Sequence, residues 1–305
     1  MTGLFDQNKI AFIGVPSSAG GRKVGQEQGP RGLRAAGLPD KLEARGYDVV
    51  DLGDLPQVTF SPDRNNPRAQ NLPLVLDVLG QVSKAVEAAV AKRAWPLVIG
   101  GDCTITIGVI AALTKHVENL GMAYVDGDVD LNTPETTSSG IFDGMVLAHI
   151  LGRGAEKLSR FGSRSPLMTE ENITLFGYSV DAGGIDPVEI ELLGDTRMAK
   201  YPLEDIEADV QGNAERALRD LEKRAEHILV HFDNDVIDCG DFPAVDVPHR
   251  PGLGLEQTEE ALKVFLASGK AAGLVVTEFN AMMDGDGHLA ERLSELIQAV
   301  LPRRD

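Results

Sequence analysis

Two short acidic segments, YVDGDVDLN (124–132) and HFDNDVID (231–238), contain the side chains with the clearest capacity for chemistry. Each follows a hydrophobic, β-branched stretch, which is typical of a buried strand that ends there. Alternate residues of a strand point to one face, so we expect the alternate members of each segment to converge. These members are Asp126, Asp128 and Asp130 in the first segment and His231, Asp233 and Asp235 in the second.

Carboxylates that converge in this way repel one another and lose hydration. One or two divalent metal ions would relieve both costs. The alternative is that these aspartates lie in solvated loops and bind nothing. That alternative requires the same coincidence twice, because both segments follow apolar strands. The two segments together therefore predict a metal site.

Two further segments end apolar runs and carry polar side chains. The turn GGDCT (100–104) follows WPLVI, and its glycines let the backbone turn tightly and present Cys103 at the head of a sheet. Glu278 follows a similar run in VVTEFN. Taken alone, the turn reads as an ordinary strand-to-helix connection and Glu278 as a capping or surface residue.

Strand-like apolar runs alternate with amphipathic helical segments almost to the end of the chain, which predicts βαβ crossovers and a mainly parallel sheet. On this pattern alone, a barrel and an open sheet are both possible. The predicted strands span residues 10–15, 48–52, 97–100, 122–125, 173–176, 198–201, 228–232 and 274–279. The predicted helices span residues 72–93, 104–117, 145–151, 187–193, 203–224, 256–267 and 287–301.

The composition favours one α/β domain over residues 1–305, with 43% hydrophobic residues to build its core. A net charge of −18 argues against nucleic acid or an anionic membrane as partner and is compatible with a small cationic substrate. No stretch is long and apolar enough to span a bilayer. The start lacks signal-peptide features, and two cysteines make no disulfide framework, so we expect a cytoplasmic protein.

Taken in order, these blocks resemble the ureohydrolase superfamily of arginases, agmatinases and related amidinohydrolases. That family's pattern runs GGDHS, DAHxDxN, a Thr/Ser-rich loop, SFDxDxxDP and EVNP. The chain has GGDCT (100–104), DGDVDLN (126–132), TPETTSSG (133–140), HFDNDVID (231–238) and EFNA (278–281) in the same order. The resemblance implies a three-layer α/β/α fold with an eight-stranded, mostly parallel sheet.

The resemblance also implies a centre of one or two Mn²⁺ ions, with Mg²⁺ as an alternative. Two of the implied ligand positions depart from the pattern, which has histidine where Cys103 and Asp128 stand. A third departure is Asp143, where arginases carry a proton-shuttling histidine. Carried over by position, the implied metal ligands are Cys103, Asp126, Asp128, Asp130, Asp233 and Asp235.

By the same resemblance, the expected activity is hydrolysis of a C–N bond in a linear guanidine or amidine, by attack of hydroxide on the guanidinium carbon. The implied catalytic residues are Asp130, Asp143 and Glu278, with Glu278 also pairing the cationic substrate. The implied contacts to the rest of the substrate are Asn132, Thr137, Ser139 and Asp181. The family analogy further implies a homo-oligomer, either a trimer or a hexamer.

The missing histidines support a rival hypothesis, a protein of the arginase fold that has lost catalysis and serves as a binding or regulatory protein. Two other histidines are candidates for function. His231 shares the metal-facing side of its predicted strand, and His249 is a candidate acid/base in the loop that follows the second acidic segment. The remaining candidates, His116, His149 and His227, fit packing or surface roles better.

Overall fold

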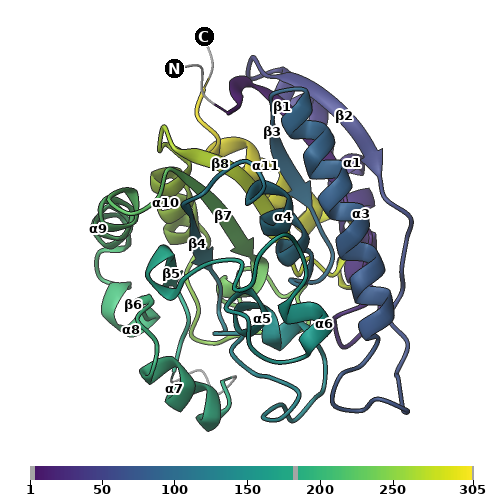
Figure 1. Ribbon diagram of the computed structural model, residues 1–305. Coiled ribbons are helices and arrows are strands. Elements are labelled where there is room, and N and C mark those ends of the chain that lie inside the picture. The colour runs from purple at the N-terminus through teal and green to yellow at the C-terminus, as the bar shows by residue number, and fades with distance from the viewer. Residues whose placement is uncertain (1–3, 181–184, 304–305) are drawn as a thin grey trace.

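A computed structural model of the chain describes residues 4–180 and 185–303. Its eight strands form one open sheet in the order β2-β1-β3-β8-β7-β4-β5-β6, and every adjacent pair is parallel (Figure 1). The predicted fold class is thus confirmed, and the sheet does not close into a barrel. The strands are β1 (Asp6–Gly14), β2 (Asp48–Asp54), β3 (Ala94–Ile99), β4 (Leu120–Val125), β5 (Ile173–Phe176), β6 (Ala199–Tyr201), β7 (His227–Asp233) and β8 (Ala271–Thr277).

The central strands read as continuous apolar runs because helices cover both of their faces. Every residue of β3, β4 and β8 is buried. The edge strand β2, by contrast, has no buried residue. The hydrophobic core therefore lies on both sides of the central strands.

Two sets of helices sandwich this sheet (Figure 1). In one set α3 packs against α4, and α4 against α5. In the other, α11 contacts α1, α2 and α10, and α10 contacts α9. The longer helices are α1 (Gly29–Ala35), α3 (Leu72–Ala91), α4 (Ile105–Leu113), α7 (Pro187–Gly194), α9 (Val210–Glu222), α10 (Leu255–Leu266) and α11 (His288–Val300). The shorter ones are α2 (Leu38–Glu43), α5 (Val146–Ile150), α6 (Glu156–Ser159) and α8 (Leu203–Ile206).

The prediction of one helix over residues 203–224 is wrong. The chain instead forms α8 and α9, with a break in which the Asp209 side chain accepts a hydrogen bond from the Gly212 N–H and so caps α9. The sequence analysis also did not predict α1 and α2, which are short and begin with a glycine or a leucine followed by proline. Among the described residues, no helix is long and apolar enough to cross a membrane.

The strand order determines where the acidic segments meet. Strands β3, β8, β7 and β4 are neighbours in that order, and because they are parallel their carboxyl ends lie at one edge. Successive strands along the chain lie apart here, since β8 and β7 are inserted between β3 and β4. Open α/β sheets bind ligands at such points.

Candidate metal centre

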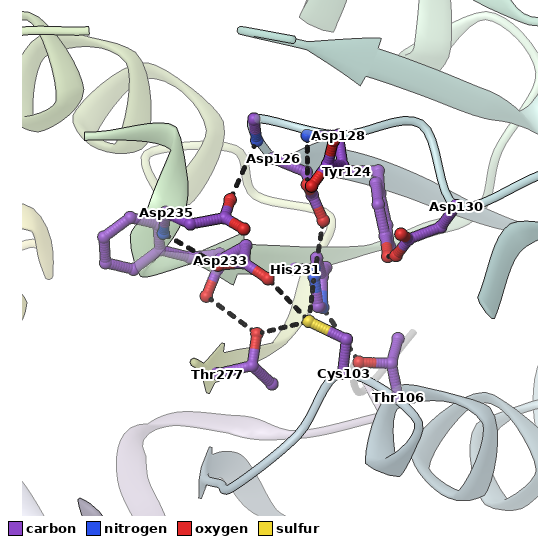
Figure 2. Close-up of polar contacts among 12 residues, drawn as sticks. Cys103, Thr106, Tyr124, Asp126, Asp128, Asp130, His231, Asp233, Asp235 and Thr277 are labelled. Carbon is purple, nitrogen blue, oxygen red and sulfur yellow. Dashed lines mark hydrogen bonds and ion pairs between the residues drawn. The ribbon is translucent and has the colours of Figure 1, made fainter. Parts of the chain in front are cut away.

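The four central strands each deliver a polar side chain to this edge. Cys103 follows β3, Asp126 follows β4 and Asp233 ends β7 (Figure 2). Glu278 directly follows β8. The turn after β3 requires glycine at position 101, because a Cβ atom there would overlap the Ser17 carbonyl oxygen.

Strand alternation does not bring the three aspartates of the first acidic segment together, so the expectation that they converge in that way is wrong. Strand β4 ends at Val125, and the three aspartates lie on the irregular backbone beyond it. Asp130 adopts a left-handed conformation with φ of 48°, and its carboxylate accepts a hydrogen bond from the Tyr124 hydroxyl. Glu278 is likewise left-handed, with φ of 66°. Such backbone strain is often found at functional sites.

Four buried side chains form what we call the inner cluster: Cys103, Asp126, His231 and Asp233. Their ligand atoms all lie within 4.8 Å of one another. The Cys103 Sγ is 2.6 Å from Asp233 Oδ2 and 3.6 Å from His231 Nε2, and that nitrogen is 3.5 Å from Asp126 Oδ2 (Figure 2).

His231 is held with Nε2 towards the inner cluster. Its Nδ1 lies 2.8 Å from the Thr106 hydroxyl, and its ring stacks on Tyr124 with centroids 4.1 Å apart. Burial lowers the pKa of His231 to about 3, so the imidazole is neutral at physiological pH. A neutral imidazole is the form that binds metal ions.

Three other side chains, Asp128, Asp235 and His249, form a second group that we call the outer cluster. The His249 Nε2 is 3.2 Å from Asp128 Oδ2 and 3.8 Å from Asp235 Oδ2. Burial lowers the pKa of His249, but the hydrogen bond to Asp128 and the charge of Asp235 outweigh it and raise that pKa to about 9. The outer cluster thus carries one histidine, as the inner cluster does.

Asp143 and Glu278 form a third group of ligand atoms with Cys103. Their ligand atoms and Cys103 Sγ lie within 4.8 Å of one another. Asp143 Oδ1 accepts a 2.8 Å hydrogen bond from the Cys103 N–H, and Glu278 Oε2 accepts one from the side-chain amide of Gln26. The sequence analysis missed Gln26, which a single sequence does not link to a residue 252 positions away.

The electrostatics of the site oppose ionisation. Burial, followed by the charges of neighbouring carboxylates, raises the pKa well above its usual range for Asp126, Asp130, Asp143, Asp233 and Glu278. Burial also raises the pKa of Asp235, to about 6. A cation that binds among so many buried carboxylates would reduce their mutual repulsion and stabilise the folded protein.

A cavity of about 320 Å³ opens onto these groups. Its lining includes nine carboxylate side chains but one arginine, Arg22. Glu189, which the sequence analysis missed, also lines it, and burial raises the pKa of Glu189 to about 7. Asp181 lies outside the described residues. All the other predicted site residues line the cavity: Cys103, Asp126, Asp128, Asp130, Asn132, Thr137, Ser139, Asp143, Asp233, Asp235 and Glu278.

Unpaired oxygen atoms show that the site fits a cation. Asp126 Oδ2 and Glu278 Oε1 are buried and accept no hydrogen bond. Buried polar atoms almost always have a partner, so these two oxygens are the kind of atom that a bound cation would satisfy. Carboxylate oxygens and imidazole nitrogens are also the donors that divalent metal ions bind.

Comparison with known proteins assigns the family. A model of the arginase family matches residues 8–301. The chain belongs to the arginase family. It is 31% identical to an arginase of Bacillus caldovelox over 279 residues, which cover 90% of this chain and 92% of that protein. It is 29% identical to an arginase of Bacillus subtilis over 295 residues, which cover 97% and 98%.

The solved structure of the Bacillus caldovelox arginase superposes on this arginase-family chain with a TM-score of 0.90 and 28% identity, and covers 97% of this chain and 99% of its own. The sequence resemblance to the superfamily is thereby confirmed. The buried acidic groups of the candidate metal centre therefore lie at the sheet edge of an arginase-family fold.

The raised pKa values predict that the metal-free protein loses stability as the pH rises from about 6.5 to about 8.5. The folded state holds a proton on His249, with its pKa of about 9, that the unfolded chain releases from about pH 6.5 upward. Burial raises the pKa of carboxylates such as Asp126 and Asp233, which acts in the same direction. Stability falls with pH wherever the folded state binds more protons. We expect the melting temperature in chelator to drop by about 5 °C.

Scanning fluorimetry at several pH values would measure this drop. Mn²⁺ is expected to abolish it, because the ion takes the place of the protons. His231 opposes this loss only at the lower end of the window, because the unfolded chain releases the His231 proton near pH 6.5 while the folded state, with a pKa of about 3, holds none. A melting temperature that rises across the same window in chelator would contradict the assignment.

Proposed function

We propose that this arginase-family protein hydrolyses a C–N bond in a linear guanidine or amidine and releases urea or a related product. One observation carries the proposal: buried carboxylates, two of them with unpaired oxygens, converge around a cavity at the edge of an arginase-family sheet. The charge of this cavity suits one or two divalent ions together with a cationic substrate.

The proposed metal ligands are the predicted set with His231 added: Cys103, Asp126, Asp128, Asp130, His231, Asp233 and Asp235. Carboxylates favour hard ions such as Mn²⁺ or Mg²⁺, and the thiol and imidazole favour softer ones. Mn²⁺ accepts both oxygen and nitrogen donors, so we propose Mn²⁺. Bound divalent ions would supply positive charge and make a water molecule acidic enough to act as nucleophile.

Glu278 is proposed to hold the guanidinium group of the substrate. Its Oε2 is oriented by Gln26, and its buried Oε1 has no hydrogen-bond partner in the protein. A guanidinium N–H that donates to this oxygen would form a charge-assisted hydrogen bond and orient the carbon under attack.

Asp143 is proposed to hold the proton for the leaving nitrogen. Burial keeps the pKa of Asp143 well above its usual range, which favours the protonated carboxyl, and its Oδ1 is oriented by the Cys103 N–H. A general acid needs such a raised pKa. Asn132, Thr137 and Ser139 line the same cavity and are proposed to contact the other end of the substrate.

Urea release from a panel of guanidino and amidino compounds, with Mn²⁺, Mg²⁺ or Zn²⁺ added to metal-free protein, tests this function. Compounds with and without an α-amino acid end should be compared, because they distinguish arginine-like from agmatine-like substrates. Turnover of any of them supports the proposal. Tight metal binding without turnover of any compound would favour the rival binding or regulatory protein.

Replacement Glu278→Gln is expected to lower kcat/KM for the preferred substrate by about 10- to 150-fold, the worth of one hydrogen bond to a charged group. The carboxylate charge is lost while the shape of the side chain is kept. Steady-state kinetics would measure the loss, and metal content by plasma mass spectrometry should stay unchanged. Wild-type kinetics in this variant would remove Glu278 from the substrate site.

A further inference from the structure

The imidazole of His249 reaches the candidate metal centre from a loop that supplies no ligand in the family pattern. The side chain is 2% exposed, and its Nε2 lies within 4.8 Å of ligand atoms from both Asp128 and Asp235. The loop is held in place by a 3.0 Å hydrogen bond from the Cys239 N–H to the His249 carbonyl oxygen.

Gly127 makes the space that the imidazole occupies. A Cβ atom at position 127 would overlap Cδ2 of His249 and lie 2.9 Å from its Nε2. The family pattern DAHxDxN has alanine at this position and histidine at the next, where this chain has Gly127 and Asp128. The alanine of the pattern would therefore exclude His249 from where it lies here.

Three departures from the family pattern thus lie together. Position 128 has aspartate in place of histidine, position 127 has glycine in place of alanine, and the His249 ring occupies the space that the alanine methyl group would fill. Asp235 completes the unit, because its Oδ1 accepts a 3.1 Å hydrogen bond from the Gly127 N–H. The outer cluster offers one imidazole and two carboxylates. Three protein ligands of this kind bind a divalent ion and leave a position open for water or substrate.

We propose that His249, Asp128 and Asp235 bind one divalent metal ion, with His249 supplying the imidazole that the family pattern carries at position 128. This inference deepens the proposed function, on which it rests for the presence of metal. The same contacts would also suit an imidazolium ion paired with both carboxylates, without a metal at this position. Counting the ions distinguishes the two.

The test is the number of Mn²⁺ ions bound by the full-length protein, measured by equilibrium dialysis and plasma mass spectrometry. We expect two ions per chain in the wild type. Replacement His249→Gln removes the donor, and Gly127→Ala displaces the ring without removing any donor. Each variant is expected to bind one ion at the Mn²⁺ concentration that saturates the wild type, with affinity for the second ion reduced at least tenfold.

Matched controls are His227→Gln at the start of β7 and Gly80→Ala in α3, where a Cβ atom meets nothing within 4 Å. Both should bind two ions. The triple variant Gly127→Ala/Asp128→His/His249→Gln has the alanine and histidine of the family pattern at positions 127 and 128. It is expected to bind the second ion again. Circular dichroism of each variant checks that it folds. If His249→Gln does not fold, the Gly127→Ala variant still tests the inference.

One bound ion in the wild type would overturn the inference, and so would two ions of unchanged affinity in folded His249→Gln and Gly127→Ala. These outcomes do not depend on turnover. If the second ion depends on His249 while no guanidino compound is hydrolysed, the inference stands and the proposed function fails.

Discussion

Removing divalent metal ions from the protein is expected to lower its melting temperature by about 10 °C. An ion present at 1,000 times its dissociation constant stabilises the folded state by about 4 kcal/mol, and two ions would act at the buried carboxylates. In a chain of this size each kcal/mol shifts the melting temperature by about 1–2 °C. Scanning calorimetry with chelator, and then with Mn²⁺ restored, would measure the shift.

The Asp233→Asn variant is the informative comparison, because Asp233 lies in the inner cluster and the neutral amide of an asparagine is a poor metal ligand. This variant should lose most of the Mn²⁺-dependent shift. Asp195→Asn, which changes an exposed aspartate at the end of α7, should keep all of it. Identical melting temperatures with and without metal in the wild type would defeat the metal-site proposal.

The Asp143→Asn variant is expected to lower kcat by about 10²- to 10⁴-fold, the usual contribution of a general acid or base. An asparagine oxygen can still accept the hydrogen bond from the Cys103 N–H, so the local structure should survive. It has no acidic proton to give to the leaving nitrogen. Substrate binding, and hence KM, should change little, which separates a loss of proton transfer from a loss of affinity.

Steady-state kinetics of Asp143→Asn should be paired with Asp143→His, which restores the family's residue at this position. Histidine again provides a group that holds a proton, so kcat is expected to stay within about tenfold of wild type. Metal content should match the wild type in both variants. Full activity in Asp143→Asn would show that another group, such as the buried Glu189, handles the proton.

The sheet could be predicted from the sequence because its central strands are buried on both faces and therefore stand out as continuous apolar runs. Strand β4 and strand β7 are examples, and the acidic residues that follow them mark their ends. The break between α8 and α9 could not be predicted in this way. It depends on Asp209, which caps α9 instead of continuing the helical pattern.

The α/β class, with a mainly parallel sheet, and the sheet edge that carries the site could be read from the pattern of strands and helices, and the family resemblance added the open, three-layer arrangement. Parallel strands place their carboxyl ends at one edge of the sheet whatever the details of the loops, so the acidic segments and Glu278 could be assigned to the same edge. Which of them are neighbours there depends on the strand order, which only the structure shows. The order of the motifs also determined the family resemblance. These conclusions depend on local patterns and on the order of elements along the chain, both of which a single sequence displays.

Only the tertiary structure decided which side chains group together. Asp126 and Asp128 are two residues apart, yet they belong to different clusters, because the backbone beyond β4 is irregular and does not follow strand alternation. The loop that carries His249 packs the His249 ring against Gly127, and no local sequence pattern specifies the path of that loop. Contacts between residues so distant in sequence depend on the packed loops, and such a loop places His249 in the candidate metal centre. His231, in contrast, lies on β7, where strand alternation could predict its direction.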